Sequence, residues 1–264
     1  MAKILAVANQ KGGVGKTSIA VNLSACLAHY GKRVLLIDLD PQGNASTGSG
    51  IDKSELRFSV YGVLLGEYSI SDALVPTAGN YDILPANREL AGAEIELVGM
   101  ERREYRLKDA CAVVLHEYDF VVIDCPPALS MLTVNGLAAA HSVVIPMQCE
   151  YYALEGLSDL VGTLRKVKAN LNPLIEIEAL VRTMYDPRNT LTVQVSDELK
   201  RYYGDKVFDT VIPRNVRIAE APSFGKPVLL YDAGSKGSLA NLAFARELLA
   251  REGQPIDAEE VFAS

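Results

Sequence analysis

The sequence has few of the side chains that form metal sites or disulfides. Its 264 residues include four cysteines and three histidines. Cys26, Cys111, Cys125 and Cys149 lack the paired spacing of zinc ligands, and the histidines are isolated. A zinc site and a disulfide framework are therefore not expected, and reduced thiols in a cytoplasm are the simplest interpretation.

Long apolar runs, a signal peptide and an obvious linker are also missing. No apolar run reaches the roughly 20 residues that span a bilayer, and the N-terminus does not follow the signal-peptide pattern. Hydrophobic residues make up 49% of the chain and charged residues 22%, as in soluble globular proteins. Because nothing divides the chain, we expect residues 1–264 to form one large domain.

The chain has fewer basic than acidic residues. It contains 26 Lys and Arg residues and 33 Asp and Glu residues, which gives a net charge of -7. This balance argues against nucleic-acid binding by bulk attraction. Residues 175–237 differ, because they hold nine basic and nine acidic residues and are neutral within an acidic chain. The composition of that segment therefore does not exclude a local basic surface.

The most informative stretch is residues 9–17, Asn-Gln-Lys-Gly-Gly-Val-Gly-Lys-Thr. An apolar run, Ile4–Ala8, predicts a strand before it, and a helical pattern over Thr17–Tyr30 follows. Glycines in such a turn let backbone N–H groups point at phosphate oxygens, and the helix N-terminus adds donors and a positive dipole end. Lys16 supplies a charge and Thr17 a hydroxyl for Mg²⁺. A strand-to-helix turn without a ligand is the weaker alternative.

The start of this motif departs from the general pattern G-x-x-x-x-G-K-[ST]. Gln10 stands where that pattern has glycine, and Lys11 follows it. The run resembles the deviant Walker A motif, K-G-G-x-G-K-[ST], of the family that includes the ATPases ParA, Soj and MinD. Lys11 cannot easily curl back onto phosphates held by its own loop, so we expect it to serve the nucleotide of another subunit in an ATP-dependent homodimer. The expected nucleotide contacts are Lys11, Gly12, Gly13, Val14, Gly15, Lys16, Thr17 and Ser18, of which Lys11 and Lys16 are also expected to assist catalysis.

A second apolar run, Val34–Ile37, predicts a buried parallel strand that leads to Asp38 and Asp40. Ligands of open parallel sheets bind at the carboxyl ends of the strands, so both carboxylates are expected beside the phosphate loop. Taken alone, the Asp-Pro-x-Gly run is better interpreted as a surface turn. After a phosphate loop it resembles the family's switch I, which implies that Asp40 orients the attacking water.

A third run, Phe120–Ile123, ends on Asp124 and resembles the Walker B pattern. In isolation it predicts only a buried strand with a capping aspartate. The resemblance implies that Asp124 and Asp38 hold Mg²⁺ through water, because this ion is reluctant to lose its hydration shell, while Thr17 binds it directly. Residues 125–127, Cys-Pro-Pro, form a stiff loop because each proline fixes its φ, and they resemble switch II.

Strands and helices alternate along the rest of the chain. This predicts a mostly parallel twisted sheet with helices on both faces, the α/β architecture of a P-loop NTPase of the deviant Walker A type. Residues 48–106 carry no assigned chemistry. Further strands are expected at Tyr81–Leu84, Ser142–Pro146, Ile175–Thr183 and Val207–Ile212, and further helices near Val60–Leu65, Glu89–Val98, Glu101–Glu117, Leu154–Leu171, Leu191–Tyr203 and Ser235–Glu252.

Residues 213–215, Pro-Arg-Asn, close the last strand at the ligand edge. By themselves they form merely a turn. The family resemblance makes Pro213, Arg214 and Asn215 a base-recognition segment, in which Asn215 offers an amide donor and acceptor to adenine and Pro213 packs on its face.

Arg188 and Arg217 match positions that contribute to DNA binding in Soj-like proteins. For either one alone, an ordinary solvated ion pair with Asp186 or Glu220 is the better interpretation. A dimer would place two copies on one face, and affinity for DNA rises steeply with the number of phosphate contacts. The resemblance thus implies ATP-dependent binding of double-stranded DNA without sequence preference. The next residues to consider are Lys200, Arg201 and Lys226.

The C-terminal segment Gln254–Phe262 is acidic and poorly suited to anionic lipid. MinD-type proteins carry a basic amphipathic helix there, so its absence favours the partitioning branch and no membrane partner. The first expected strand starts at Ile4, so no DNA-reading domain is expected before it. The resemblance covers essentially the whole chain and is strongest to chromosomal Soj and ParA.

Our first hypothesis is therefore a slow, Mg-dependent ATPase of chromosome or plasmid partition. It dimerises around ATP, binds DNA on the nucleoid and is reset by hydrolysis that a ParB-type partner stimulates. A MinD-like division-site ATPase is one alternative, and a metabolic ligase or kinase of the same fold is another, although no second polar pocket is evident. An iron–sulfur reductase would need a second cysteine ligand besides Cys125.

Overall fold

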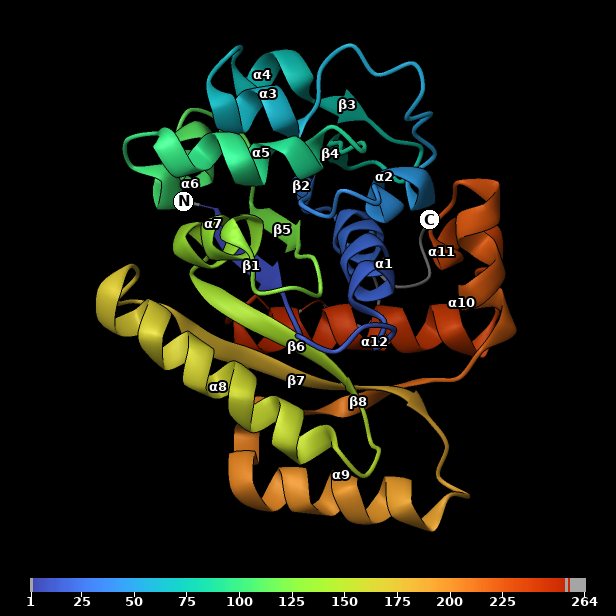
Figure 1. The fold of residues 1–264 in the computed structure, drawn as a ribbon. Coiled ribbons are helices and arrows are strands. Elements are labelled where there is room, and N and C mark those ends of the chain that lie inside the picture. Colours follow the sequence, from blue (N-terminus) through green and yellow to red (C-terminus); the bar gives the residue numbers. More distant parts are fainter. Residues whose placement is uncertain (1, 255, 257–264) are drawn as a thin grey trace.

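The computed structural model describes residues 2–254 and residue 256 (Figure 1). It is built around an eight-stranded sheet in the order β3-β4-β2-β5-β1-β6-β7-β8. Every neighbouring pair is parallel except β3 and β4, which are antiparallel. The expected mostly parallel sheet is confirmed. The strands are β1 (Lys3–Val7), β2 (Val34–Asp38), β3 (Val75–Pro76), β4 (Asp82–Leu84), β5 (Phe120–Asp124), β6 (Ser142–Gln148), β7 (Glu176–Tyr185) and β8 (Val207–Pro213).

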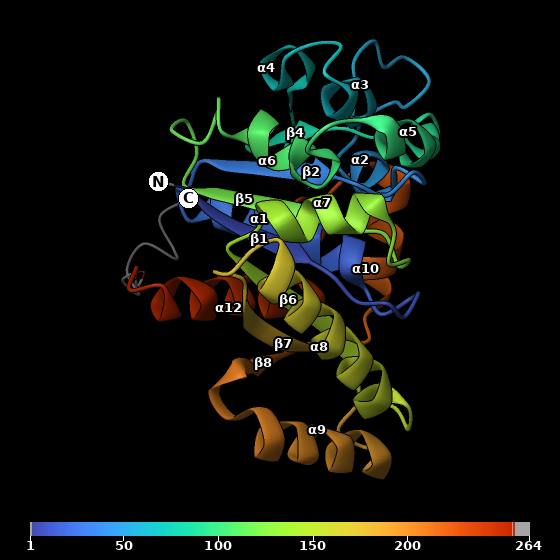
Figure 2. The same cartoon turned by 60° about the vertical axis from the view of Figure 1, so that its left-hand side comes forward.

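Helices cover both faces of this sheet, as expected, and each face has its own apolar core. Helices α1 and α12 pack together on one face, while α3, α5, α6, α7 and α8 contribute to the core of the other. Figure 2 shows α7 and α8 on the side that comes forward. The helices are α1 (Lys16–His29), α2 (Asn44–Gly48), α3 (Val60–Leu65), α4 (Ile70–Ala73), α5 (Leu90–Glu96), α6 (Arg106–Cys111), α7 (Met131–Ala139), α8 (Ala153–Asn170), α9 (Thr190–Tyr203), α10 (Val216–Glu220), α11 (Val228–Tyr231) and α12 (Lys236–Arg251), with 3₁₀ turns η1 (Leu97–Gly99), η2 (Arg103–Tyr105), η3 (Gly204–Lys206) and η4 (Ala221–Phe224).

The central strands are short and apolar because both of their faces are covered. All five residues of β2 and all five of β5 are buried, as is usual for parallel strands between two helical layers. β1 lies between β5 and β6, so the loop that follows Val7 emerges in the middle of the sheet. The ends of β5 and then β2 lie on one side of that loop, with Asp38 and Asp124 as partners in register.

The expectation of one helix over Glu101–Glu117 is wrong. Arg102 has a positive φ of 53°, η2 follows it, and α6 covers only Arg106–Cys111 before a turn at residues 112–117. The helix ends early because the chain must turn back to start β5 at Phe120. Sequence reasoning also missed α7, a helix whose residues are mostly buried and which therefore lacks a polar stripe.

No helix in the described part of the chain combines the length and the apolar character that crossing a bilayer requires. The expectation about the acidic segment Gln254–Phe262 falls, apart from Gln254 and Ile256, outside the described residues.

Candidate nucleotide site

The loop between β1 and α1 has the backbone of a phosphate cradle. Gly13 and Gly15 have φ values of 73° and 89°, which L side chains rarely adopt. Gly15 precedes the first helical residue, Lys16, so the N-terminus of α1 opens directly onto the loop. Nothing lies within 4 Å of the space where side chains at Gly12 and Gly13 would begin. The loop thus presents bare backbone and helix donors to an anion.

Asn9, a buried residue that sequence reasoning did not select, holds the start of the loop. Its Nδ2 donates to the carbonyl of Pro146 at 2.8 Å, and its Oδ1 accepts the Lys11 N–H at 3.0 Å. One side chain therefore ties the loop to β6 and also shapes the turn.

Two side chains from later strands hold the middle of the loop. Gln148 Nε2 donates to the carbonyl of Gly13 at 3.1 Å, and Thr183 Oγ1 donates to the carbonyl of Val14 at 2.8 Å. Both residues lie toward the carboxyl ends of their strands, β6 and β7. With these carbonyls held outward, the loop N–H groups stay free for a ligand. The position of Gln148 and Thr183 at strand ends is the only signal by which the sequence could have indicated these two residues.

Lys16 lies inside the loop. Its side chain is buried, and its ammonium donates to the carbonyl of Lys11 at 3.0 Å. Burial lowers the pKa of Lys16, while the carboxylates of Asp124 and Asp40 act in the opposite direction. The charge is therefore held at the centre of the cradle by a loop carbonyl and nearby acids.

The side chain of Lys11 contacts a residue outside its own loop. Its Nζ forms an ion pair with Glu150 Oε2 at 2.6 Å, and about half of each side chain is exposed. An exposed pair of this kind is weak, so the lysine can exchange this partner for another anion at little cost.

Asp38 is fully buried at the end of β2, and both of its carboxylate oxygens accept hydrogen bonds. Its carboxylate accepts the backbone N–H and the hydroxyl of Ser46, both at 2.8 Å, and the N–H of Asp40 at 3.1 Å. Burial raises the pKa of Asp38, and the hydrogen bonds from Ser46 counteract this. Asp38 thereby fixes the path of the segment that follows β2.

Asp124 is also fully buried, but neither of its carboxylate oxygens accepts a hydrogen bond from the described residues. Burial, followed by the charge of Asp38, raises its pKa well above the ordinary value, while the neighbouring Thr17 hydroxyl and, after it, Lys16 act against this. Two buried carboxylates lie at one sheet edge, and the carboxylate of Asp124 has no hydrogen-bond partner among the described residues. A hydrated divalent cation at this edge would neutralise their charges and donate hydrogen bonds from its water molecules. Asp38, Asp124 and the nearby Thr17 hydroxyl therefore fit Mg²⁺.

Asp40 sits in a tight turn after β2. Its carboxylate accepts the Gln42 N–H at 2.9 Å, and its carbonyl accepts the Gly43 N–H at 2.8 Å. Gly43 has a φ of 61°, and a Cβ there would lie 2.6 Å from the carbonyl oxygen of Ala86. This position therefore requires glycine, and the turn that carries Asp40 is packed against a fixed neighbour.

Cys125 follows β5 as a buried thiol whose pKa is raised by burial. A Cβ on Gly136 of α7 would come within 2.9 Å of its sulfur. A protonated, closely packed thiol is a poor iron ligand, which weighs against the iron–sulfur alternative.

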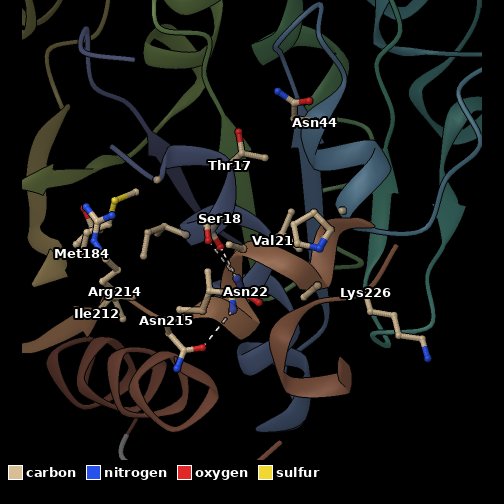
Figure 3. Close-up of a pocket in the computed structure, with 18 of the residues that line it drawn as sticks. Thr17, Ser18, Val21, Asn22, Asn44, Met184, Ile212, Arg214, Asn215 and Lys226 are labelled. Atoms are coloured by element: carbon tan, nitrogen blue, oxygen red, sulfur yellow. Dashed lines mark hydrogen bonds between the residues drawn. The ribbon is translucent and has the colours of Figure 1, made fainter. Parts of the chain in front are cut away.

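A cavity of about 500 Å³ opens beside the loop, and its lining includes Pro213, Arg214 and Asn215 (Figure 3). Asn215 Oδ1 accepts the N–H groups of Arg217 and Ile218 as the N-cap of α10. Its acceptor lone pairs are thus used, which leaves Nδ2 as the group available to a base.

Several residues of this cavity were not found from the sequence. Asn22 Oδ1 accepts the N–H of Val228 at 2.7 Å, which ties α1 to α11 behind the cavity. Met184 lines the opposite side with a φ of 49°, unusual for a side chain of its size. The remaining unpredicted lining residues include Asn44, Thr47, Gly48, Thr183 and Ile218.

The two arginines expected to bind DNA both form ion pairs. Arg188 binds Asp186 through two nitrogens, at 2.9 and 2.7 Å. Arg217 contacts Glu220 at 3.0 Å and Asp232 at 3.1 Å. Both arginines follow the carboxyl ends of their strands, so they lie at the same edge of the sheet as the phosphate loop.

Comparison with known proteins gives strong matches. A family model described as an AAA domain matches residues 2–177. The chain is 54% identical to the sporulation initiation inhibitor protein Soj of Bacillus subtilis, over 95% of this chain and 99% of that protein. It is also 54% identical to the chromosome partitioning protein ParA of Caulobacter vibrioides, over 95% of each chain.

A crystal structure of a Mycobacterium smegmatis protein described as cobyrinic acid a,c-diamide synthase, with bound ADP and magnesium, is also similar. Its TM-score is 0.84 and its identity 39%, over 98% of this chain and 100% of that one. A protein of the same fold and related sequence therefore holds a nucleotide and Mg²⁺.

Proposed function

The chain belongs to the ParA/Soj family of chromosome-partitioning ATPases, and from that premise we propose that it is a Mg-dependent ATPase working as a nucleotide-controlled DNA-binding switch. Residues 1–264 act as one ATPase domain. ATP drives formation of a sandwich dimer, the dimer binds DNA without sequence preference in the cytoplasm, and a ParB-type partner stimulates the hydrolysis that resets it.

Three groups that lie together at one sheet edge support the proposal of ATP binding and hydrolysis. Lys16 is buried inside a clamped glycine loop, Asp124 is buried without a hydrogen-bond partner among the described residues, and the Asp40 turn is fixed beside them. Mg²⁺, when bound, neutralises phosphate charge. Lys16 and the loop N–H groups bind the phosphates, and Asp40 orients water.

Hydrolysis by the protein alone is expected to be slow. In-line attack on a phosphate is accelerated strongly by a cation that neutralises transition-state charge. Lys11 is directed to Glu150 and away from its own loop, so an isolated subunit lacks that additional charge. A second subunit supplies Lys11, and a partner protein supplies further help.

Replacing Lys11 by Ala tests the dimer. We expect ATP binding to change little, because Lys11 contributes only its backbone carbonyl to the position of Lys16. ATP-dependent dimers and hydrolysis should be lost, because the lysine charge acts on the nucleotide of the other subunit. Analytical ultracentrifugation with ATP and with ADP measures this directly. Lys166→Ala, which removes an exposed lysine from α8, is the control, and dimers like those of the wild type in Lys11→Ala would contradict the assignment.

The DNA surface is tested through Arg188 and Arg217. Each Arg→Ala change should weaken binding to unrelated duplexes by a similar factor. It should also flatten the plot of log affinity against log salt by about one unit per lost phosphate contact, and so by about two in a symmetric dimer. The matched control is Arg33→Ala, which removes an arginine equally paired to Asp119 at 2.8 Å but placed at the opposite edge of the sheet. Unchanged salt slopes in both variants would place the DNA surface elsewhere.

A metabolic ATP-dependent enzyme is the second candidate, because the similar Mycobacterium smegmatis protein is described as a synthase. Oligomeric state and duplex binding, measured with ADP, with ATP and without nucleotide, separate the two functions. DNA binding that appears only with ATP supports the partitioning switch. ATP-independent monomers without DNA affinity would support the enzyme.

A further inference from the structure

A second hollow lies at the edge of the sheet opposite to the nucleotide site. It is a groove of about 310 Å³ between the C-terminal half of α8, the start of β7 and η3. Figure 1 shows the C-terminal ends of α8 and α9 on the same side of the molecule, at the left. None of the groove residues takes part in the chemistry described above. We name it the β7 groove, and it is lined by Val161, Leu164, Arg165, Lys168, Ile175, Glu176, Ile177 and Lys206.

The floor of the β7 groove is apolar. Leu164 and Ile175 are buried, and Val161 and Ile177 are half-buried. Next to the floor, the side chain of Leu174 is 77% exposed. A floor of aliphatic side chains favours a ligand that has apolar groups to bury.

The rim of the β7 groove is basic in an otherwise acidic chain. Arg165, Lys168 and Lys206 surround the floor, against the single carboxylate of Glu176. Only Lys168 approaches that carboxylate, at 3.7 Å, and within residues 2–254 and 256 neither Arg165 nor Lys206 forms an ion pair. Two cations without counter-ions therefore stand beside an apolar floor, which suits an anionic ligand with apolar side chains.

On its β8 side the start of β7 has no strand partner, although η3 contacts β7. β7 begins at Glu176, but its register with β8 begins only at Leu180, opposite Val207. Residues 176–179 therefore pair with β6 alone. An unpaired strand edge next to side-chain pockets is the setting in which an extended peptide adds as a further strand.

From these observations we propose that the β7 groove binds an extended acidic peptide of a partner protein. The peptide alternates apolar and acidic residues, because successive side chains of a strand point to opposite sides. Apolar side chains fill the floor over Leu164 and Ile177, and acidic ones meet Arg165 and Lys206. DNA is the less favoured ligand, because a phosphate backbone has no apolar groups for this floor. The proposal does not depend on the proposed ATPase function, since β7 reaches the phosphate loop only at its other end, through Thr183.

The test uses the full chain and a fluorescent synthetic peptide, Asp-Val-Glu-Phe-Glu-Val-Asp, in an anisotropy titration. We expect saturable binding, and we expect the double variant Arg165→Glu, Lys206→Glu to weaken it by about tenfold or more. Lys166→Glu is the matched control, because it reverses an exposed charge on the same helix outside the groove and should leave affinity within about twofold. ATP turnover should be unchanged in all variants.

One further peptide, a duplex-binding measurement and one truncation decide between occupants. A peptide with serine in place of Val and Phe should bind at least about tenfold more weakly, and equal binding would show a merely charged patch and overturn the proposal. Loss of duplex affinity in the double variant, without peptide binding, would assign the groove to DNA and also overturn it. Truncation after Gln254 should leave peptide affinity unchanged, whereas a rise would show that the chain's own acidic end occupies the groove.

Discussion

Replacing Lys16 by Gln is expected to abolish measurable ATP binding. The ammonium is the one charge held inside the loop, where it donates to the Lys11 carbonyl until phosphate oxygens are present. Hydrogen bonds to charged groups contribute about 1.5–3 kcal/mol each, so losing two of them lowers affinity by about a hundredfold or more. Isothermal titration with Mg-ATP gives the affinity directly.

The matched control makes the same substitution five residues earlier, as Lys11→Gln. That variant should bind ATP nearly as well as the wild type, because the Lys11 side chain is directed to Glu150. Comparable thermal unfolding of the two variants would show that the fold is intact. ATP binding by Lys16→Gln at the wild-type level would remove Lys16 from the phosphate site.

Replacing Asp40 by Ala should stop the cycle at a later step. The variant is expected to bind Mg-ATP and to dimerise, because its phosphate loop is unaltered, but to hydrolyse ATP at least about a hundredfold more slowly. Misplacing one reactant by about 1 Å is enough for a loss of that size. Single-turnover hydrolysis gives the rate, and sedimentation should show dimers accumulating with ATP.

Asp52→Ala is the control for this change, because it removes an exposed aspartate that also accepts hydrogen bonds, in the turn after α2. It should hydrolyse ATP at the rate of the wild type. A normal single-turnover rate in Asp40→Ala would exclude the residue from the mechanism, while failure of that variant to bind ATP would give Asp40 a structural role in the loop.

The elements that the sequence predicted best are those whose pattern is local. β5 covers Phe120–Asp124, as expected, because four apolar residues end on an acid. α3 matches the expected Val60–Leu65. The phosphate loop was recognisable because its glycines, lysine and threonine are consecutive.

The features that the sequence did not reveal depend on partners that are distant in the chain. Asn9 acts through Pro146, and Thr183 acts through Val14, so nothing in either local run indicates the contact. Asn215 was expected to offer a base both a donor and an acceptor. Its oxygen instead caps α10, a five-residue helix with too short a periodic pattern to predict.

The clamping of the loop by Gln148 and Thr183 has a consequence for biosynthesis. Chains emerge from the ribosome N-terminus first, at about 5–20 residues per second. The phosphate loop is therefore made early, but β1 has no neighbouring strand until β5 is made. The Val14 carbonyl has no hydrogen-bond donor until Thr183 leaves the exit tunnel. The complete phosphate cradle therefore forms only after more than two thirds of the chain has been translated.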